Sequence, residues 1–384
     1  LATAQLVPLP SEVWANLPGH RDIAIFDAIL RQGEVARPLT ISTAKTVNAL
    51  FALTVPLAAW AAIAHPSNLS RWRALLSFLL ILATLGAILG FMQTAGSAGS
   101  NLYFYEITNR GQSVGFFANR NHHAVFLCCG IAIASYLTVT APPEPRLSFE
   151  RMLPATLGIV LTLAVIANAS RAALIILLGM VLVVGIVAVG RQAAAAISTR
   201  RSHGSIPILL GLASLVACLS IFWLLDRSPA MQRLVGQDPS SDLRASIFPI
   251  LIQMASDFQP WGSGLGTFEY AYRSYELPTL FQSAYVNNAH NDWLQFVIEG
   301  GMPALAILLG SFAMIVMRLS HIVRDPSARI AEPLLGLALI GIIGAASIVS
   351  YPLRTPAFMV LGVIALALVW STDLPRIQPS EKRR

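Results

Sequence analysis

The feature that most constrains the fold of this chain is a series of nine apolar runs, each close to the length of a membrane-spanning helix. Such a helix needs about 20 apolar residues to cross the hydrocarbon core of a bilayer. Only 12% of the 384 residues are charged, whereas soluble globular proteins carry about a quarter. The sequence therefore predicts an all-α polytopic membrane protein. The nine runs cover approximately residues 45–64, 74–94, 122–140, 154–169, 172–190, 206–225, 302–317, 332–350 and 356–372.

The basic residues divide the runs and set their orientation. Arg171 separates the fourth run from the fifth, because a lone arginine at the bilayer centre is costly. Fourteen of the 26 basic residues lie in the short connections and the C-terminal tail on one side of the spans. Short loops rich in Lys and Arg stay in the cytoplasm, so the longer segments 1–44, 95–121 and 226–289 are predicted to face outward, into the periplasm of a bacterium.

This topology predicts five parts along the chain. They are a periplasmic N-terminal segment 1–44, transmembrane helices 1–6 in 45–225, a periplasmic catalytic loop 226–289, transmembrane helices 7–9 in 290–372, and a cytoplasmic tail 373–384.

Composition also argues against several classes of function. The formal charge of +7 is accounted for by the basic residues that orient membrane helices, so it does not indicate nucleic-acid binding. Cys128, Cys129 and Cys218 all lie in apolar runs without CxxC spacing. They are typical of small core residues and do not predict a disulfide framework or a metal site.

The loop 226–289 is too long for a simple connection. Ser241 or Asp242 is a candidate helix N-cap. The apolar residues that follow at helical spacing, Ile247, Leu251, Ile252 and Met254, predict an amphipathic helix on the membrane surface, with Arg244 on its first turn. The glycines of GSGLGTF suggest either a phosphate cradle or a tight turn, and we favour the turn because no strand–helix context surrounds them.

Four ionisable residues fall on the predicted outward face: Arg120, Arg171, Arg244 and His290. An arginine can hold phosphate oxygens bidentately and stays charged, and a histidine can exchange a proton near neutral pH. Together they suit an anionic lipid-linked substrate, especially one with a pyrophosphate leaving group. Each also has a simpler interpretation, since juxtamembrane arginines commonly snorkel to lipid phosphates and a histidine beside Asn and Asp can belong to a helix cap.

Nearby polar residues are supporting candidates. Asn291 and Asp292 would orient His290 or cap its helix. Asn121 lies directly before the run 122–140, at the end that is predicted to face outward. Glu299 precedes GGMP, where glycines and proline break or restart a helix. We favour Glu299 as a helix-end carboxylate near the lipid boundary over the alternatives, in which it holds an arginine or polarises His290.

Four stretches of the chain are distinctive: ANRNHHAVFL, NASRAALIILL, SDLRASIFPILIQMASDFQPWGSGLGTFEYAY and NNAHNDWLQFVIEGGMPALAILL. In this order they resemble the signature segments of the O-antigen ligase/polymerase superfamily. The similar region runs from about Gly115 to Leu309, roughly half of the chain. The opening AQLVPLPSEVWANLPG is also similar to an outward loop of exopolysaccharide polymerases in this superfamily. Further helices precede that loop in those proteins, and this chain starts at Leu1, so we expect upstream helices.

The resemblance implies a GT-C-type, metal-independent glycosyltransferase without a cofactor, in the bacterial inner membrane with a periplasmic active face. Its partners would be a glycan donor on undecaprenyl pyrophosphate, a lipid or glycan acceptor hydroxyl and the membrane lipids, and the reaction would invert the anomeric carbon. Family arginines match Arg171 and Arg244, which would bind the pyrophosphate, and the family's loop histidine matches His290, the expected base. Arg120 would grip the donor or anchor its helix.

The chain departs from the family pattern at three places. It has Ala172 where the family often has glycine, and EGGMPAL replaces the more usual Glu-Leu-Gly-Leu-Pro-Gly. The NRNHH stretch also carries a second histidine, to which the resemblance assigns no role. His122 and His123 begin an apolar run, and bonding to neighbouring backbone is their simpler interpretation.

Three other functions remain open. A transporter or flippase would carry ionisable residues inside its spans, and here the runs are nearly free of charge. A non-catalytic scaffold for polysaccharide assembly would not depend on His290. Within the enzyme class, polymerases, ligases and protein O-oligosaccharyltransferases share these motifs, so the sequence does not single one out. We favour a polymerase or ligase of surface polysaccharide.

Overall fold

The computed structural model describes residues 1–30, 35–63, 69–142, 148–183, 239–278, 286–324 and 330–371. The described chain is predominantly helical and divides into two compact units. Unit 1 combines Leu1–Arg73 with Ser240–Arg384, and unit 2 comprises Ala74–Pro239. Each unit is described by itself.

The N-terminal part of unit 1 consists of short elements tied to a more distant part of the chain. Strands β1 and β2 pair antiparallel, with Pro8 opposite Pro38. The amide of Gln5 donates to the carbonyl of Glu299 at 2.9 Å, and its carbonyl oxygen accepts from the backbone N–H of Leu265 at 2.9 Å. The predicted outward segments 1–44 and 226–289 therefore pack together. The elements are α1 (Ala2–Gln5), β1 (Pro8–Leu9), α2 (Ser11–Trp14), α3 (Arg21–Ile29), β2 (Arg37–Pro38), α4 (Thr43–Ala52) and α5 (Thr54–Ile63).

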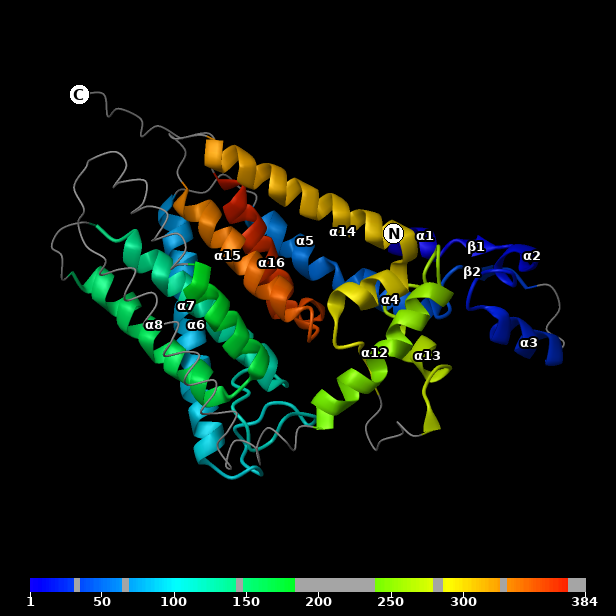
Figure 1. Cartoon of the computed structure of the whole chain (residues 1–384), viewed down its shortest axis with the longest axis horizontal. Coiled ribbons are helices and arrows are strands. Elements are labelled where there is room, and N and C mark those ends of the chain that lie inside the picture. Colours follow the sequence, from blue (N-terminus) through cyan, green and yellow to red (C-terminus); the bar gives the residue numbers. More distant parts are fainter. Residues whose placement is uncertain are drawn as a thin grey trace. The chain divides into compact units, whose positions relative to one another are not determined.

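The rest of unit 1 contains two long helices and a group of apolar ones. Helix α16 packs against α15 and α5, and the three run side by side in Figure 1. Helix α14 is kinked at Gly301, whose φ of 60° and ψ of −150° are not helical. The elements are α12 (Pro239–Asp257), α13 (Phe268–Arg273), α14 (Asp292–Arg324), α15 (Ala331–Ala346), the 3₁₀ turn η2 (Pro352–Arg354) and α16 (Pro356–Val369).

Unit 2 is built around α7 (Arg120–Val139), which packs closely against α8 (Phe149–Asn168). Most of helix α6 (Leu69–Ala95) also belongs to unit 2, which begins at Ala74. A further helix of this unit covers Arg171–Val183. Gly130 of α7 has no room for a side chain, because a Cβ there would lie 2.8 Å from both Ala83 of α6 and Leu161 of α8. Small residues let membrane helices approach closely, and this glycine does so for three helices at once.

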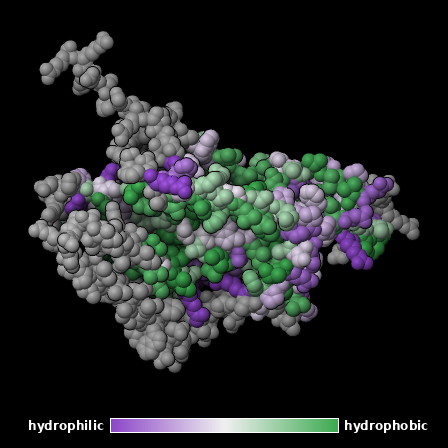
Figure 2. Space-filling view, turned by 45° about the horizontal axis from the view of Figure 1, so that its top comes forward, coloured by the Kyte–Doolittle hydropathy of each residue, from purple (hydrophilic) through white to green (hydrophobic). Residues whose placement is uncertain are grey.

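The outer face of α6 shows the pattern expected for lipid contact. Apolar residues recur on it every three or four positions and are about half exposed, whereas Leu76, Leu80 and Ala83 on the other side are buried. Figure 2 shows such hydrophobic side chains over much of the visible surface of the described residues. A large apolar surface of this kind marks contact with a membrane or a partner. The exposed residues of the α6 stripe are Phe78, Ile81, Leu85 and Ile88.

The expectation of a polytopic helical membrane protein is confirmed. Within the described residues, five helices are long and apolar enough to cross a membrane, and three shorter apolar helices cover Arg171–Val183, Ala331–Ala346 and Pro356–Val369. The predicted span 206–225, the end of span 172–190 and the tail 373–384 lie outside the described residues, so the count of nine stays a prediction. The long spans are Thr43–Ile63, Trp72–Ala95, Arg120–Val139, Phe149–Asn168 and Asp292–Ile322.

Candidate active site

His290 lies in a short loop of unit 1 that leads directly into α14. Its backbone is left-handed, with φ of 53°, a conformation uncommon for residues other than glycine. The loop is held by neighbouring side chains: Ala289 donates its N–H to Gln295 Oε1 at 2.8 Å, and Asn291 Oδ1 accepts from the N–H of Leu294 at 3.0 Å. Asn291 therefore caps the helix, which is one of the two roles expected for it. The His290 ring meets the ring of Tyr351 edge-on, with centroids 5.1 Å apart.

Asp292 begins α14 and ties it to the turn between α15 and α16. Its carboxylate accepts from Ser347 Oγ at 3.1 Å and from the N–H of Leu353 at 3.0 Å. It also lies 3.4 Å from the guanidinium of Arg354. The side chain is almost fully buried. Asp292 therefore fixes the position of the turn that carries Tyr351, the ring against His290.

Glu299 lies two turns further along α14 and is 1% exposed. Its carboxylate accepts from Arg354 Nη2 at 3.1 Å, from Gln295 Nε2 at 3.0 Å and from the backbone N–H of Phe268 at 3.2 Å. The favoured interpretation, a helix-end carboxylate near the lipid boundary, is therefore wrong. The alternative in which Glu299 holds an arginine is confirmed, because buried carboxylates need charged or hydrogen-bonding partners.

Arg354 is a residue of this site that the sequence analysis did not single out. It joins Asp292 and Glu299, which lie 62 and 55 positions earlier in the chain. One signal was present: Arg354 falls between the last two apolar runs, at a connection that alternation places on the outward face. Its partners were not readable, because they lie on another helix.

The glycine turn after α12 is a structural support for the α14 kink. The backbone N–H groups of Gly262, Ser263 and Gly264 donate to the carbonyls of Phe258, Ile298 and Glu299 at 2.7, 3.0 and 2.9 Å. A Cβ on Gly262 would collide with the Glu299 carbonyl, and one on Gly301 with the Pro260 carbonyl. The expectation of a tight turn is confirmed. These three N–H groups are already used, so the turn does not supply them to a phosphate.

Helix α12 carries Arg244 and packs on α13. Three of its predicted apolar residues, Ile247, Leu251 and Met254, are buried in a cluster with residues of α13 and Ile298, whereas Ile252 is 49% exposed. The amphipathic pattern is thus confirmed, but its apolar face meets protein. The N-cap expectation is wrong: α12 begins at Pro239, so Ser241 and Asp242 lie in its first turn. Arg244 is partly buried.

In unit 2, hydrogen bonds join the N-terminus of α7 to the segment that carries Arg171. Asn121 Oδ1 accepts from the hydroxyl of the buried Ser170 at 2.8 Å. The side-chain amide of Asn168 donates to the carbonyl of Arg120 at 3.4 Å. Arg171 itself is exposed and Arg120 is partly exposed. Asn121 is thus bonded to Ser170, directly before Arg171, and its supporting role in the site stays a prediction.

His122 and His123 are both buried in unit 2. His123 Nδ1 lies 3.1 Å from the carbonyl of Ser113 and 3.3 Å from its hydroxyl. Gly90 and Gly115 have no room for a side chain, because a Cβ on either would lie within 3 Å of the His123 ring. The expectation that this histidine bonds to backbone is confirmed, and its environment is that of a packing residue.

The candidate residues are distributed over both units. Arg120, Asn121 and Arg171 belong to unit 2, whereas Arg244 and the His290 loop belong to unit 1. Their convergence on one substrate stays a prediction. Across the part of the chain that the structure describes, no group of three or more His, Cys, Asp or Glu side chains is placed to hold a metal ion.

The apolar helices and the polar residues gathered at their ends define a multi-pass helical membrane protein with a candidate site at a helix terminus. Residues 156–309 match the sequence model of the O-antigen ligase family, which confirms the resemblance to this superfamily. The matched region supports a membrane glycosyltransferase of the O-antigen ligase/polymerase type. It contains Arg171, Arg244 and His290, whereas Arg120 and Arg354 lie outside it. No curated protein that was compared matches the chain.

Proposed function

We propose that this protein transfers a glycan from undecaprenyl pyrophosphate to an acceptor hydroxyl, as a polymerase or ligase of bacterial surface polysaccharide. The family match over residues 156–309 supports the class of reaction. The observation that carries the assignment to a particular residue is the left-handed backbone of His290 at the start of α14. Such a conformation costs about 1–3 kcal/mol and persists where surrounding contacts impose it, as at many functional sites.

In the proposed reaction, a ring nitrogen of His290 accepts the proton of the acceptor hydroxyl. The acceptor oxygen forms a bond to the anomeric carbon from one face, and the bond from that carbon to the pyrophosphate oxygen breaks on the opposite face. The configuration is therefore inverted. Undecaprenyl pyrophosphate leaves with the bonding electron pair, and the proton stays on the histidine until solvent removes it. General-base catalysis of this kind contributes about 10²- to 10⁴-fold in rate.

Arg171 and Arg244 would bind the pyrophosphate, with Arg120 as a third contact. The leaving group gains negative charge as the bond breaks, and fixed cations placed at that charge stabilise the transition state. The exposure of Arg171 and the partial exposure of Arg244 are compatible with contact to a substrate. In this scheme the arginines carry the role that a divalent cation has in metal-dependent transferases.

Substitution at these positions tests the proposal. His290→Ala should lower product formation in membranes by at least about 100-fold, and Arg171→Ala and Arg244→Ala should each do so by about 100- to 1000-fold. His321→Ala is a matched control, because His321 lies exposed in the last turn of α14. Wild-type product from both arginine variants would end the pyrophosphate assignment, and wild-type product from His290→Ala would end the assignment of the base.

Polymerase and ligase are separated by the intermediates that accumulate in a deletion strain. A lost polymerase leaves single capped repeat units, whereas a lost ligase leaves long chains on the lipid carrier. Deletion of a protein O-oligosaccharyltransferase would instead leave the surface glycan unchanged and abolish glycosylation of a protein acceptor.

A further inference from the structure

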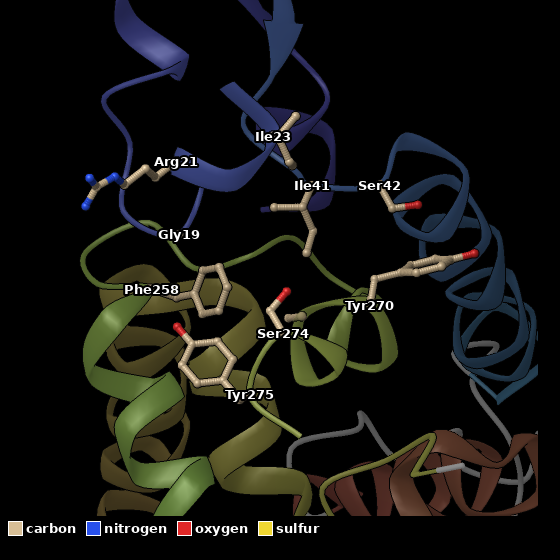
Figure 3. A pocket seen from close by; sticks show the side chains of 10 residues that line it. Gly19, Arg21, Ile23, Ile41, Ser42, Phe258, Tyr270, Ser274 and Tyr275 are labelled. Carbon is tan, nitrogen blue, oxygen red and sulfur yellow. The ribbon is translucent and has the colours of Figure 1, made fainter. Parts of the chain in front are cut away.

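Unit 1 contains a pocket of about 400 Å³ that is distinct from the residues around His290. Two segments far apart in the sequence form it, the N-terminal segment on one side and α12–α13 on the other (Figure 3). Both segments are predicted to face outward. Its volume falls within the range typical of small-molecule sites. The pocket is lined by Gly19, Arg21, Ile23, Ile41, Ser42, Phe258, Tyr270, Ala271, Ser274 and Tyr275.

The two walls are joined by direct contacts between them. Gly19, with φ of 76°, lies so close to the Phe258 ring that a Cβ would collide with it. Ile41 donates its N–H to the carbonyl of Ser263 at 2.9 Å. Within the N-terminal wall, the buried His20 ring lies within hydrogen-bond distance of the carbonyls of Pro18 and Leu39, at 3.0 and 2.7 Å. A preformed pocket binds with less loss of conformational entropy.

The chemistry of the lining is amphipathic. The rings of Phe258 and Tyr275 lie 6.2 Å apart at 52° on one side of the pocket, and Tyr270 lies on the other. Ser274 places its hydroxyl between them, as Figure 3 shows. The Tyr275 hydroxyl is oriented by Asp257 Oδ2 at 3.1 Å.

Tyr270 is held in place at the rim of the pocket. It is 44% exposed, and two cations lie over its ring: Lys45 Nζ at 5.1 Å and the Arg273 guanidinium at 5.7 Å from the centroid. Both cations pair with Glu269, at 3.0 and 2.7 Å. An aromatic ring supplies large contact area with little conformational entropy to lose, and here its position is fixed before binding.

We propose that this pocket is a saccharide-binding subsite that holds sugar rings of the glycan away from the bond that reacts. A sugar ring has an apolar C–H face and a rim of hydroxyls, which match aromatic rings set beside serine and tyrosine hydroxyls. The subsite contributes binding affinity and fixes the position of the glycan relative to the reacting bond. It takes no part in bond breaking. The inference rests on the proposed function for the identity of the ligand, since the donor and acceptor of that reaction are glycans.

The test measures binding and catalysis separately in the full-length protein. The probe is the oligosaccharide that mild acid releases from the lipid-linked pool of the source cells, which contains no lipid or pyrophosphate. Tyr270→Ala should weaken its binding by about three- to tenfold, the worth of one aromatic contact. Ser274→Trp should abolish binding, because the exposed Ser274 side chain would be replaced by one that fills the pocket. Tyr270→Phe keeps the ring and should bind normally.

The kinetic readout distinguishes this subsite from the proposed active site. Tyr270→Ala should raise KM with kcat unchanged, because it removes binding that is equal in ground and transition states. His290→Ala should still bind the probe. Probe binding that is unaffected by Ser274→Trp and Tyr270→Ala would overturn the subsite. Retained activity of His290→Ala together with lost probe binding of Ser274→Trp would overturn the proposed base and leave the subsite standing.

Discussion

Replacing Arg354 with methionine would keep an apolar side chain of similar length and remove the cation that joins two buried carboxylates. Glu299 is 1% exposed and Asp292 is 5% exposed, with Arg354 nitrogens at 3.1 and 3.4 Å. Removing one partner of a buried ion pair costs about 3–5 kcal/mol, because the other charge is left uncompensated. The Arg354 side chain is 27% exposed, so we expect about 3 kcal/mol, the lower end of that range.

The measured quantity is the free energy of unfolding of the purified protein in detergent. It is compared among the wild type, Arg354→Met, Arg273→Ala and a double variant. Arg273→Ala is the control, because that exposed arginine pairs with Glu269 at 2.7 Å within one helix and such pairs contribute less than about 1 kcal/mol. Glu299→Gln in the Arg354→Met background should recover part of the loss, since it replaces a buried charge with a neutral amide. A loss no larger than that of Arg273→Ala, or no recovery in the double variant, would refute the reasoning.

Three further outcomes follow from the described contacts. Gly301→Ala should strongly reduce the amount of folded protein, because the φ of 60° and the nearby carbonyl exclude a Cβ. Gly310→Ala is the control, since open space surrounds this glycine and the change in stability should be less than about 1 kcal/mol. The measurement is the yield of folded protein of each variant after detergent extraction. Asn121→Ala should cost about 1–3 kcal/mol of unfolding free energy, because a buried hydroxyl loses its acceptor. Tyr351→Ala should lower kcat about tenfold by removing the ring that positions His290, and Tyr351→Phe should not; kcat rising or staying constant in the alanine variant would contradict this role.

The interpretation of Glu299 shows where sequence reasoning reached its limit. Its position before GGMP correctly predicted a break in a helix, because glycine and proline act on the local backbone. Whether a carboxylate at such a break faces lipid or protein depends on what another helix brings to it. Here that is Arg354, 55 residues further along the chain, and no local pattern identifies the pair.

The glycine turn and α12 show the same division. The helical period of Ile247, Leu251 and Met254 correctly predicted which side of α12 is buried, since periodicity alone defines a face. The pattern did not reveal whether membrane or protein covers that face, because both are apolar. It is covered by α13 and residues of α14, and the glycines allow the backbone approach that brings them together.

By itself, the sequence determined that this is a multi-pass helical protein and where most of its apolar helices lie, because bilayer thickness sets a length that any single segment must meet. It also carried the family resemblance that residues 156–309 confirm. Only the tertiary structure decided that Asp292, Glu299 and Arg354 form one network beside His290, and that the N-terminal segment builds a pocket with α12–α13. The physical reason is that buried charges and cavities depend on partners from distant segments, which become neighbours only when the helices pack.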